Sequence, residues 1–179
     1  MLVWLPCLAQ EPACHVAANS TEGQSLHTYS VPELSLINAQ GQRVQMQQLI
    51  RTDKAVALQF IFTTCSTVCP ALSNSLAQLQ QDRNVLCISV SIDPEFDTPA
   101  RLLAYGQALK ARPDWQFLTG TIEQVAQLQR AFDAYQPGKQ QHLPLTFLRP
   151  ANASQWLRIE GFPSGPQLQA HFKKEPPAP

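Results

Sequence analysis

The stretch that decides the fold is AVALQFIFTTCSTVCP, residues 55–70. Residues 55–62 form a nearly continuous apolar run, which is typical of a central strand covered on both faces. Apolar residues then recur at spacings of four, four and three, which is a helical period. They are Val68, Leu72, Leu76 and Leu79. Two cysteines, Cys65 and Cys69, therefore lie where a buried strand gives way to a helix.

This position makes the two cysteines a candidate reactive site. The start of a helix has unpaired N–H groups and the positive end of the helix dipole, and both favour the thiolate form of a thiol. The thiolate is the nucleophile and the metal ligand. A Cys-x-x-x-Cys spacing places the two sulfurs about one turn apart on one face. The pair is therefore suited to a shared soft metal ion or to a reversible disulfide.

Strands and helices alternate through the rest of the chain. Residues 33–37 alternate like a strand, and 43–46 can return as the hairpin partner after a turn. Residues 85–92 predict a second buried strand. Further strands are expected at 114–118, 145–148 and 156–159, and further helices after Thr98, after Thr121 and around Leu168 and Phe172. This order predicts an α/β domain with a central mixed β-sheet flanked by helices and an N-terminal β-hairpin.

Composition limits the size of the protein and its partners. At 179 residues and 44% hydrophobic, the chain can bury one core and is expected to form one domain. Thirteen basic residues balance thirteen acidic ones, and the only basic cluster is Lys173 with Lys174, so nucleic acid is not an expected partner. No apolar run approaches the roughly 18 residues that a membrane-spanning helix needs.

The two ends of the chain are expected to lie outside the domain. Residues 1–28 are interpreted as a poorly ordered tail and as the remnant of a signal or anchor, because an apolar start is followed by small residues. Residues 29–175 form the predicted domain, and 176–179 are a proline-rich end. Cys7 and Cys14 fall in the tail, whereas Cys87 is expected to be a small core residue.

A histidine further along the chain completes a candidate metal site. A strand that ends in a paired-cysteine turn and opens a helix is the thioredoxin-type arrangement, but thioredoxins use Cys-x-x-Cys and this chain has one more residue. The extra residue favours metal. Cu(I) prefers thiolates and accepts imidazole, so two cysteines and one histidine would give a three-coordinate site. His142 is the best candidate, because in this architecture the loop before the strand at 145–148 lies beside the cysteine turn.

These residues make the chain similar to the Sco/SenC family of copper-handling, thioredoxin-like proteins. The matching segments, in order, are VPEL at 31–34 with the hairpin after it, FTTCSTVCP at 62–70, ISVSIDPEFDTP at 88–99, and His142 before a strand. The resemblance covers most of the chain. It implies a thioredoxin-like fold and copper ligation by Cys65, Cys69 and His142.

The same resemblance implies a cellular role. The protein would help to mature the binuclear copper site of a respiratory oxidase, as copper donor, as thiol reductant of the target's cysteines, or both. The implied metal is Cu(I) or Cu(II), and the implied partners are a copper-accepting oxidase subunit or another copper protein, together with a thiol-disulfide reductant. The implied location is periplasmic or otherwise extracytoplasmic. Membrane association would require an N-terminal anchor that is not recognised in this sequence.

Three further residues are candidates for supporting the site. Asp93 and Asp97 could orient a ligand or receive a partner, or they could simply form a turn and a helix start. Pro144 occupies the place where thioredoxin-like oxidoreductases keep a cis-proline facing the cysteines. Because the cis form of an X–Pro bond costs only about 0.5 to 1 kcal/mol, a cis Leu143–Pro144 bond is an option that would favour thiol-disulfide chemistry beside metal binding.

Three function classes remain open from the residues alone. The first is a copper metallochaperone that releases its metal when Cys65 and Cys69 form a disulfide. The second is a thiol-disulfide oxidoreductase in which Cys65 attacks a partner disulfide, Cys69 resolves it and His142 is dispensable. The third is a thiol peroxidase, which 66–70 echoes as Ser-x-x-Cys-Pro. The sequence favours the metallochaperone over a turnover enzyme and ranks the peroxidase last.

Overall fold

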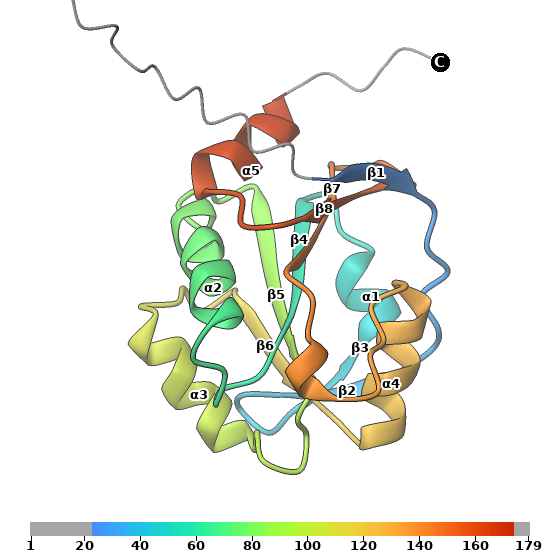
Figure 1. The fold of residues 1–179 in the computed structure, drawn as a ribbon. Coiled ribbons are helices and arrows are strands. Elements are labelled where there is room, and N and C mark those ends of the chain that lie inside the picture. The colour runs from blue at the N-terminus through green and yellow to red at the C-terminus, as the bar shows by residue number, and fades with distance from the viewer. Residues whose placement is uncertain (1–22, 174–179) are drawn as a thin grey trace, which may run out of the picture.

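The computed structural model describes residues 23–173 as one mixed sheet with helices on both faces (Figure 1). The strands are β1 (Gln24–His27), β2 (Ser35–Asn38), β3 (Arg43–Gln45), β4 (Ala55–Ile61), β5 (Val85–Ser91), β6 (Gln116–Thr119), β7 (Leu145–Arg149) and β8 (Trp156–Glu160). The helices are α1 (Met46–Ile50), α2 (Val68–Leu79), α3 (Pro99–Ala108), α4 (Ile122–Ala131) and α5 (Gly165–Lys173), with a 3-10 turn, η1, at Lys139–Gln141. The strand order is β1-β8-β7-β4-β5-β6-β2-β3.

The centre of the sheet is the strand that leads to the cysteines. Every residue of β4 and of β5 is buried, and the two strands run parallel. β7 pairs antiparallel with the other edge of β4. The continuous apolar runs therefore form central strands, as predicted, because a strand covered on both faces has no solvent side. The mixed α/β sheet and the β2–β3 hairpin are likewise confirmed.

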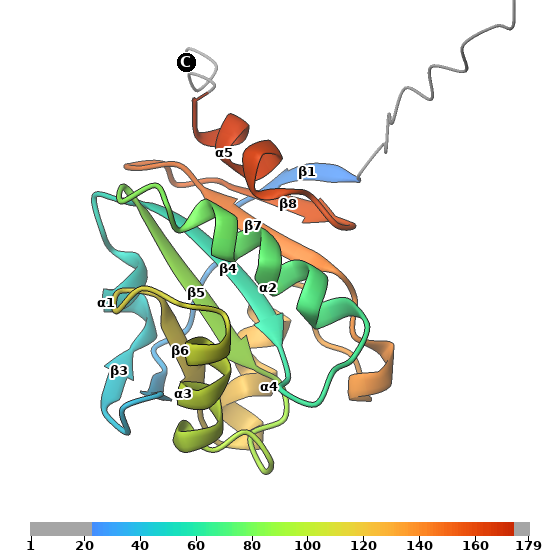
Figure 2. The ribbon, with the colours of Figure 1, turned by 90° about the vertical axis from the view of Figure 1, so that its left-hand side faces the viewer.

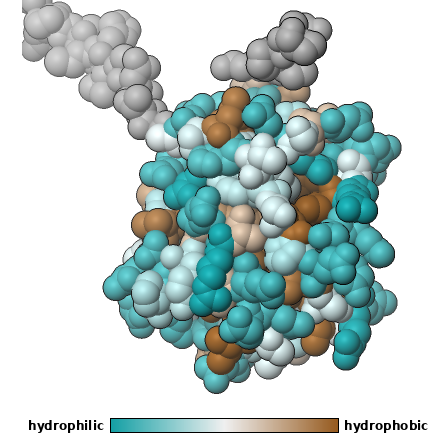
Figure 3. Space-filling model, turned by 90° about the vertical axis from the view of Figure 1, so that its right-hand side faces the viewer, coloured by the Kyte–Doolittle hydropathy of each residue, from teal (hydrophilic) through white to brown (hydrophobic). Residues whose placement is uncertain are grey.

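Helices cover the two faces of the sheet unequally. Figure 2 shows α2 and α3 over one face, with α5 beside α2. Their buried side chains pack with Cys69, Cys87 and Trp115 in one core cluster. α1 and α4 lie on the other face (Figure 1), where aromatic rings including Phe60, Phe132 and Phe147 form the second cluster. On the side that Figure 3 shows, hydrophobic residues form small separate patches among hydrophilic ones.

The structure differs from the sequence prediction at one edge of the sheet. β1 lies within the stretch assigned to the tail, yet it pairs antiparallel with β8, Gln24 opposite Ile159. Three of its four residues are exposed, so no apolar alternation marks it. The short helix α1 was not predicted, because five residues are too few to show a helical period. Cys7, Cys14 and the signal-like start lie outside the described residues.

In residues 23–173, no helix is both long enough and apolar enough to cross a bilayer.

Candidate metal and thiol site

The cysteine turn links the end of β4 to the start of α2. The side chain of Thr67, the residue before α2, makes no capping hydrogen bond. The sulfur of Cys65 takes that place instead, because the backbone N–H of Cys69 donates to Cys65 Sγ over 3.3 Å. The predicted position of the pair at a helix start is confirmed. Cys65 satisfies one of the N–H groups that a helix leaves unpaired.

The second cysteine lies deeper and faces the histidine. Cys69 is fully buried in the first turn of α2, whereas Cys65 is half-buried. Cys69 Sγ is 3.7 Å from His142 Nδ1. The loop before β7 is therefore beside the cysteine turn, as predicted, because β7 pairs with β4 and brings its preceding residues to the strand end that carries the cysteines. The ring of Phe62 also meets the imidazole edge-on, with centroids 5.9 Å apart.

A small cleft opens this site to solvent. It has a volume of about 310 Å³, and Cys65, Lys139 and His142 are among the residues that line it. Cys69 is not part of the lining. A partner or an ion that enters the cleft therefore meets Cys65 and His142 first, with Cys69 beneath them.

The three side chains are close in pairs but do not form a closed metal site. Cys65 contacts Cys69, and Cys69 contacts His142. Within residues 23–173, no three His, Cys, Asp or Glu side chains are grouped closely enough to hold a metal ion as they stand. The donor types nevertheless match a soft cation, because two sulfurs and one imidazole are the ligands that Cu(I) accepts.

The two thiols differ in acidity. Burial alone would raise the pKa of Cys65, but hydrogen bonds from Cys69 and Thr67 outweigh it, and its pKa lies below the ordinary value. For Cys69, burial raises the pKa well above the ordinary value, and its hydrogen bond to Cys65 raises it further. Burial also lowers the pKa of His142, opposed in part by a hydrogen bond to the Phe60 carbonyl. At neutral pH the imidazole is therefore uncharged and keeps a lone pair for a ligand.

This asymmetry predicts a selective alkylation. In reduced protein near pH 7, iodoacetamide should modify Cys65 well before Cys69 or Cys87, because the thiolate reacts and Cys65 has the lowered pKa and the exposure. Burial raises the pKa of Cys87 to about 12. Peptide mass mapping over time checks this, in a variant with Cys7→Ser and Cys14→Ser so that only three thiols remain. Equal labelling of Cys65 and Cys69 would contradict the assignment.

The buried carboxylate of Asp97 accepts hydrogen bonds from the cysteine turn. It is fully buried and accepts hydrogen bonds from Thr63 N at 3.0 Å, from Thr63 Oγ1, and from Ser91 Oγ at 2.6 Å. It lies at the helix start before α3, where Thr98 is the N-cap. The carboxylate thus ties the backbone two residues before Cys65 to the end of β5. Its contact with Thr63 was not predicted, because nothing in the sequence pairs residues 34 positions apart.

Asp93 makes an ion pair with the histidine loop. Lys139 Nζ lies 2.5 Å from Asp93 Oδ2. Lys139 belongs to η1, three residues before His142. The sequence marked Asp93 as a candidate but gave no signal for Lys139, whose importance arises only from the tertiary contact.

Pro144 does not have the conformation considered for it. The Leu143–Pro144 bond is trans, and no cis bond occurs in residues 23–173. Trans is the lower-energy isomer of an X–Pro bond, and here the Pro144 carbonyl accepts a hydrogen bond from Gly161 N over 2.9 Å. Pro144 therefore joins the loop to the end of β8. The trans bond corrects the sequence interpretation, which considered a cis bond here.

Comparisons with known proteins identify the family of this chain. The family model SCO1/SenC matches residues 22–146. The SCO1 protein homolog of Bacillus subtilis is 33% identical over 98 residues, 51% of this chain and 50% of that protein, so the chain spans about half the length of this curated relative.

Solved structures share the fold. Arabidopsis thaliana ScoI with copper bound superposes with a TM-score of 0.67 at 22% identity, covering 81% of this chain and 95% of that one. BsSco, described with a disulfide switch and as a member of the Sco family of cytochrome c oxidase assembly proteins, gives 0.66 at 24%, covering 80% and 90%. At these identities the likeness shows the fold alone, which is the thioredoxin-like fold of Sco proteins.

Proposed function

Because this chain belongs to the SCO1/SenC family, we propose that it is a copper-binding metallochaperone with a redox-active dithiol. The proposal is supported by the copper bound to the ScoI structure of Arabidopsis thaliana. It is also supported by the assembly role and disulfide switch with which BsSco is described. The cargo is a copper ion, and the ligands are the Cys65 and Cys69 thiolates with the His142 imidazole.

The observation that carries this proposal is the placement of Cys69 between the other two ligands. Its sulfur lies 3.7 Å from His142 Nδ1, and its N–H donates to Cys65 Sγ over 3.3 Å. A plain dithiol needs no imidazole at this point. A soft monovalent ion accepts sulfur and imidazole donors, and Cys69 adjoins both of the other candidate donors.

Each residue has a distinct part in capture and release. Cys65 faces the cleft with the lowered pKa and therefore offers the first thiolate. Cys69 gives up its proton on binding, since a metal ligand must be deprotonated. Uncharged His142 supplies a nitrogen lone pair without losing a proton.

Redox chemistry of the same thiols provides the release. When the Cys65 and Cys69 thiolates of the loaded site form a disulfide, they give two electrons to a partner disulfide, which takes up two protons from solvent and becomes two thiols. The new disulfide has no thiolates, so the copper loses two of its three ligands. The copper-loaded form and the disulfide form are then mutually exclusive states of one site.

The partners follow from these steps. The copper acceptor is an oxidase subunit or another copper protein. The cysteines of this acceptor form the disulfide that Cys65 and Cys69 reduce. A separate thiol reductant restores Cys65 and Cys69. We place this exchange in an extracytoplasmic compartment, in keeping with the family role in oxidase assembly.

A thiol-disulfide oxidoreductase without metal transfer is the second candidate. The acidity difference favours it, because an exposed thiol with a lowered pKa attacks well and a buried neighbour can resolve the mixed disulfide. In that function His142 binds nothing.

Anaerobic titration of the reduced protein with Cu(I) against a competing chelator separates the two functions. The Cys7→Ser/Cys14→Ser background removes the two other thiols outside the described domain. We expect one Cu(I) bound per chain in competition with the chelator. No binding would contradict the metallochaperone and leave the oxidoreductase.

A further inference from the structure

In the loop before His142, one side chain of residues 136–141 bonds to another part of the described structure. The backbone bonds of the loop are those of its own turn, from Gln141 N to Gly138 O and from His142 N to Lys139 O. Lys139 reaches out of the loop to Asp93. In the described structure, no other side chain of residues 136–141 makes a hydrogen bond or ion pair with another element.

The other end of this ion pair is firmly held. Asp93 N donates to Ser91 Oγ over 3.0 Å, and the Asp93 carbonyl accepts from Phe96 N and Asp97 N. The Asp93 side chain is only 13% exposed, compared with 40% for Lys139. Ser91 also donates to Asp97, which holds Thr63 in the cysteine turn. The backbone of Asp93 is therefore held in place beside the turn that carries Cys65, and its carboxylate is largely buried.

Lys139 also lies over a ring that contacts the histidine. Its Nζ is 5.8 Å from the centroid of the Phe62 ring. The same ring packs edge-on against His142. Lys139 is therefore connected to His142 in two ways, along the chain of its own loop and through the ring of Phe62.

We propose that the Asp93–Lys139 ion pair is a positioning device that holds His142 against Cys69. The inference rests on the proposed function, in which His142 is a copper ligand. Lys139 touches no metal and acts through the loop. Without the ion pair, η1 keeps its own turn but loses its fixed distance from β5. His142 then spends less time near Cys69, and the third ligand must be recruited at each binding event.

Loss of the ion pair is expected to change the position of His142 and not the free energy of unfolding. Ion pairs between partly exposed groups contribute little to folding, and Lys139 is on a short loop turn. Lys139→Met keeps the apolar stem and removes the charge. It should leave the denaturant midpoint nearly unchanged while loosening the histidine.

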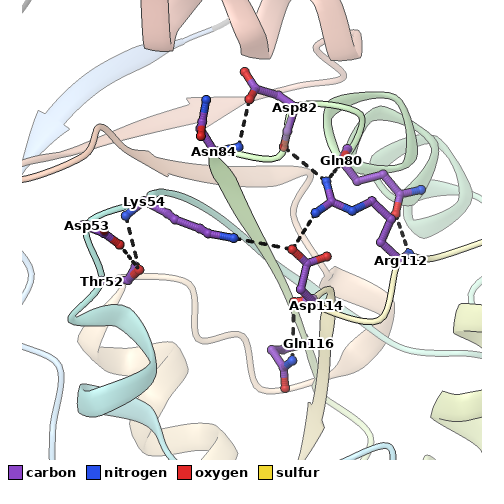
Figure 4. Close-up of polar contacts among 9 residues, drawn as sticks. All are labelled: Thr52, Asp53, Lys54, Gln80, Asp82, Asn84, Arg112, Asp114 and Gln116. Carbon is purple, nitrogen blue, oxygen red and sulfur yellow. Dashed lines mark hydrogen bonds and ion pairs between the residues drawn. The ribbon is translucent and has the colours of Figure 1, made fainter.

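The chain offers a matched control at the opposite end of the sheet. Figure 4 shows Lys54 paired with Asp114, just before β4 begins, at 3.6 Å. The Lys54 side chain is 40% exposed, as is that of Lys139. Lys54→Met therefore removes a lysine–carboxylate ion pair away from the site, where Asp114 keeps its ion pair with Arg112. Lys139→Arg restores the charge at the site.

The test has a metal-free arm and a copper arm. In reduced, metal-free protein, NMR cross-peaks between the ring protons of Phe62 and His142 should weaken in Lys139→Met and Asp93→Asn, and should persist in Lys54→Met and Lys139→Arg. Cu(I) affinity should fall about tenfold in Lys139→Met, the lower end of losses seen when a residue that orients a ligand is removed. The Asp93→Asn/Lys139→Met double variant should lose no more than either single variant.

The outcomes separate this inference from the proposed function. Unchanged cross-peaks in Lys139→Met overturn the positioning role, whatever copper does. Cross-peaks that weaken equally in Lys54→Met also overturn it, because the effect would then be general. If wild type binds no Cu(I), the proposed function fails, and the metal-free arm still decides whether the ion pair positions His142.

Discussion

Replacing either Cys65 or Cys69 with serine is expected to abolish tight Cu(I) binding. A hydroxyl is a hard donor that stays protonated at neutral pH, so each change removes one of two soft ligands. The loss should exceed about 100-fold, which is the upper range for removing a residue that merely supports a ligand. Competition titration of the reduced variants measures it.

Oxidation should have the same effect without any substitution. Wild-type protein in which Cys65 and Cys69 form a disulfide has no thiolates at the site and should bind no Cu(I). Cys87→Ala is the matched control, because Cys87 is buried in β5 away from the cleft and should leave copper affinity unchanged. Retained affinity in a serine variant or in the disulfide form would contradict the coupling of metal state to redox state.

Asp97→Ala is expected to give the largest loss of folding stability among changes near the site. Three buried or half-buried donors, Thr63 N, Thr63 Oγ1 and Ser91 Oγ, would lose their acceptor at once. An unsatisfied buried donor costs about 1 to 3 kcal/mol. Allowing for partial rescue by water in the cavity left behind, the free energy of unfolding should fall by about 3 kcal/mol.

Denaturant unfolding, with matched variants, measures the role of Asp97. Asp97→Asn keeps one acceptor oxygen and should lose less than the alanine variant. Asp53→Ala removes an exposed carboxylate that accepts a 3.4 Å hydrogen bond from Thr52 Oγ1, and it should change stability by less than about 0.5 kcal/mol. A loss for Asp97→Ala no larger than that of Asp53→Ala would show that the turn does not depend on this carboxylate.

Local patterns predicted the elements that carry the cysteines. The apolar runs of β4 and β5 and the period of α2 are written in consecutive residues, so they can be found in a single sequence. The N-caps of α3 and α4, Thr98 and Thr121, were found for the same reason. The placement of His142 beside the cysteines followed from strand order, because β7 had to pair within the same sheet.

Features that depend on distant contacts were missed. β1 is mostly exposed and has no apolar pattern, so it is recognised as a strand only through its pairing with β8. Lys139 resembles any loop lysine until its ammonium is seen beside Asp93.

The most direct test of the central claim is the contribution of His142 to Cu(I) affinity. The reduced Cys7→Ser/Cys14→Ser protein, with and without His142→Ala, should be titrated anaerobically with Cu(I) against the same competing chelator. We expect one Cu(I) per chain when His142 is present and an affinity at least about tenfold weaker in the His142→Ala form, since an imidazole ligand would be lost while both thiolates remain. Equal affinity in the two proteins would contradict a two-cysteine, one-histidine copper site.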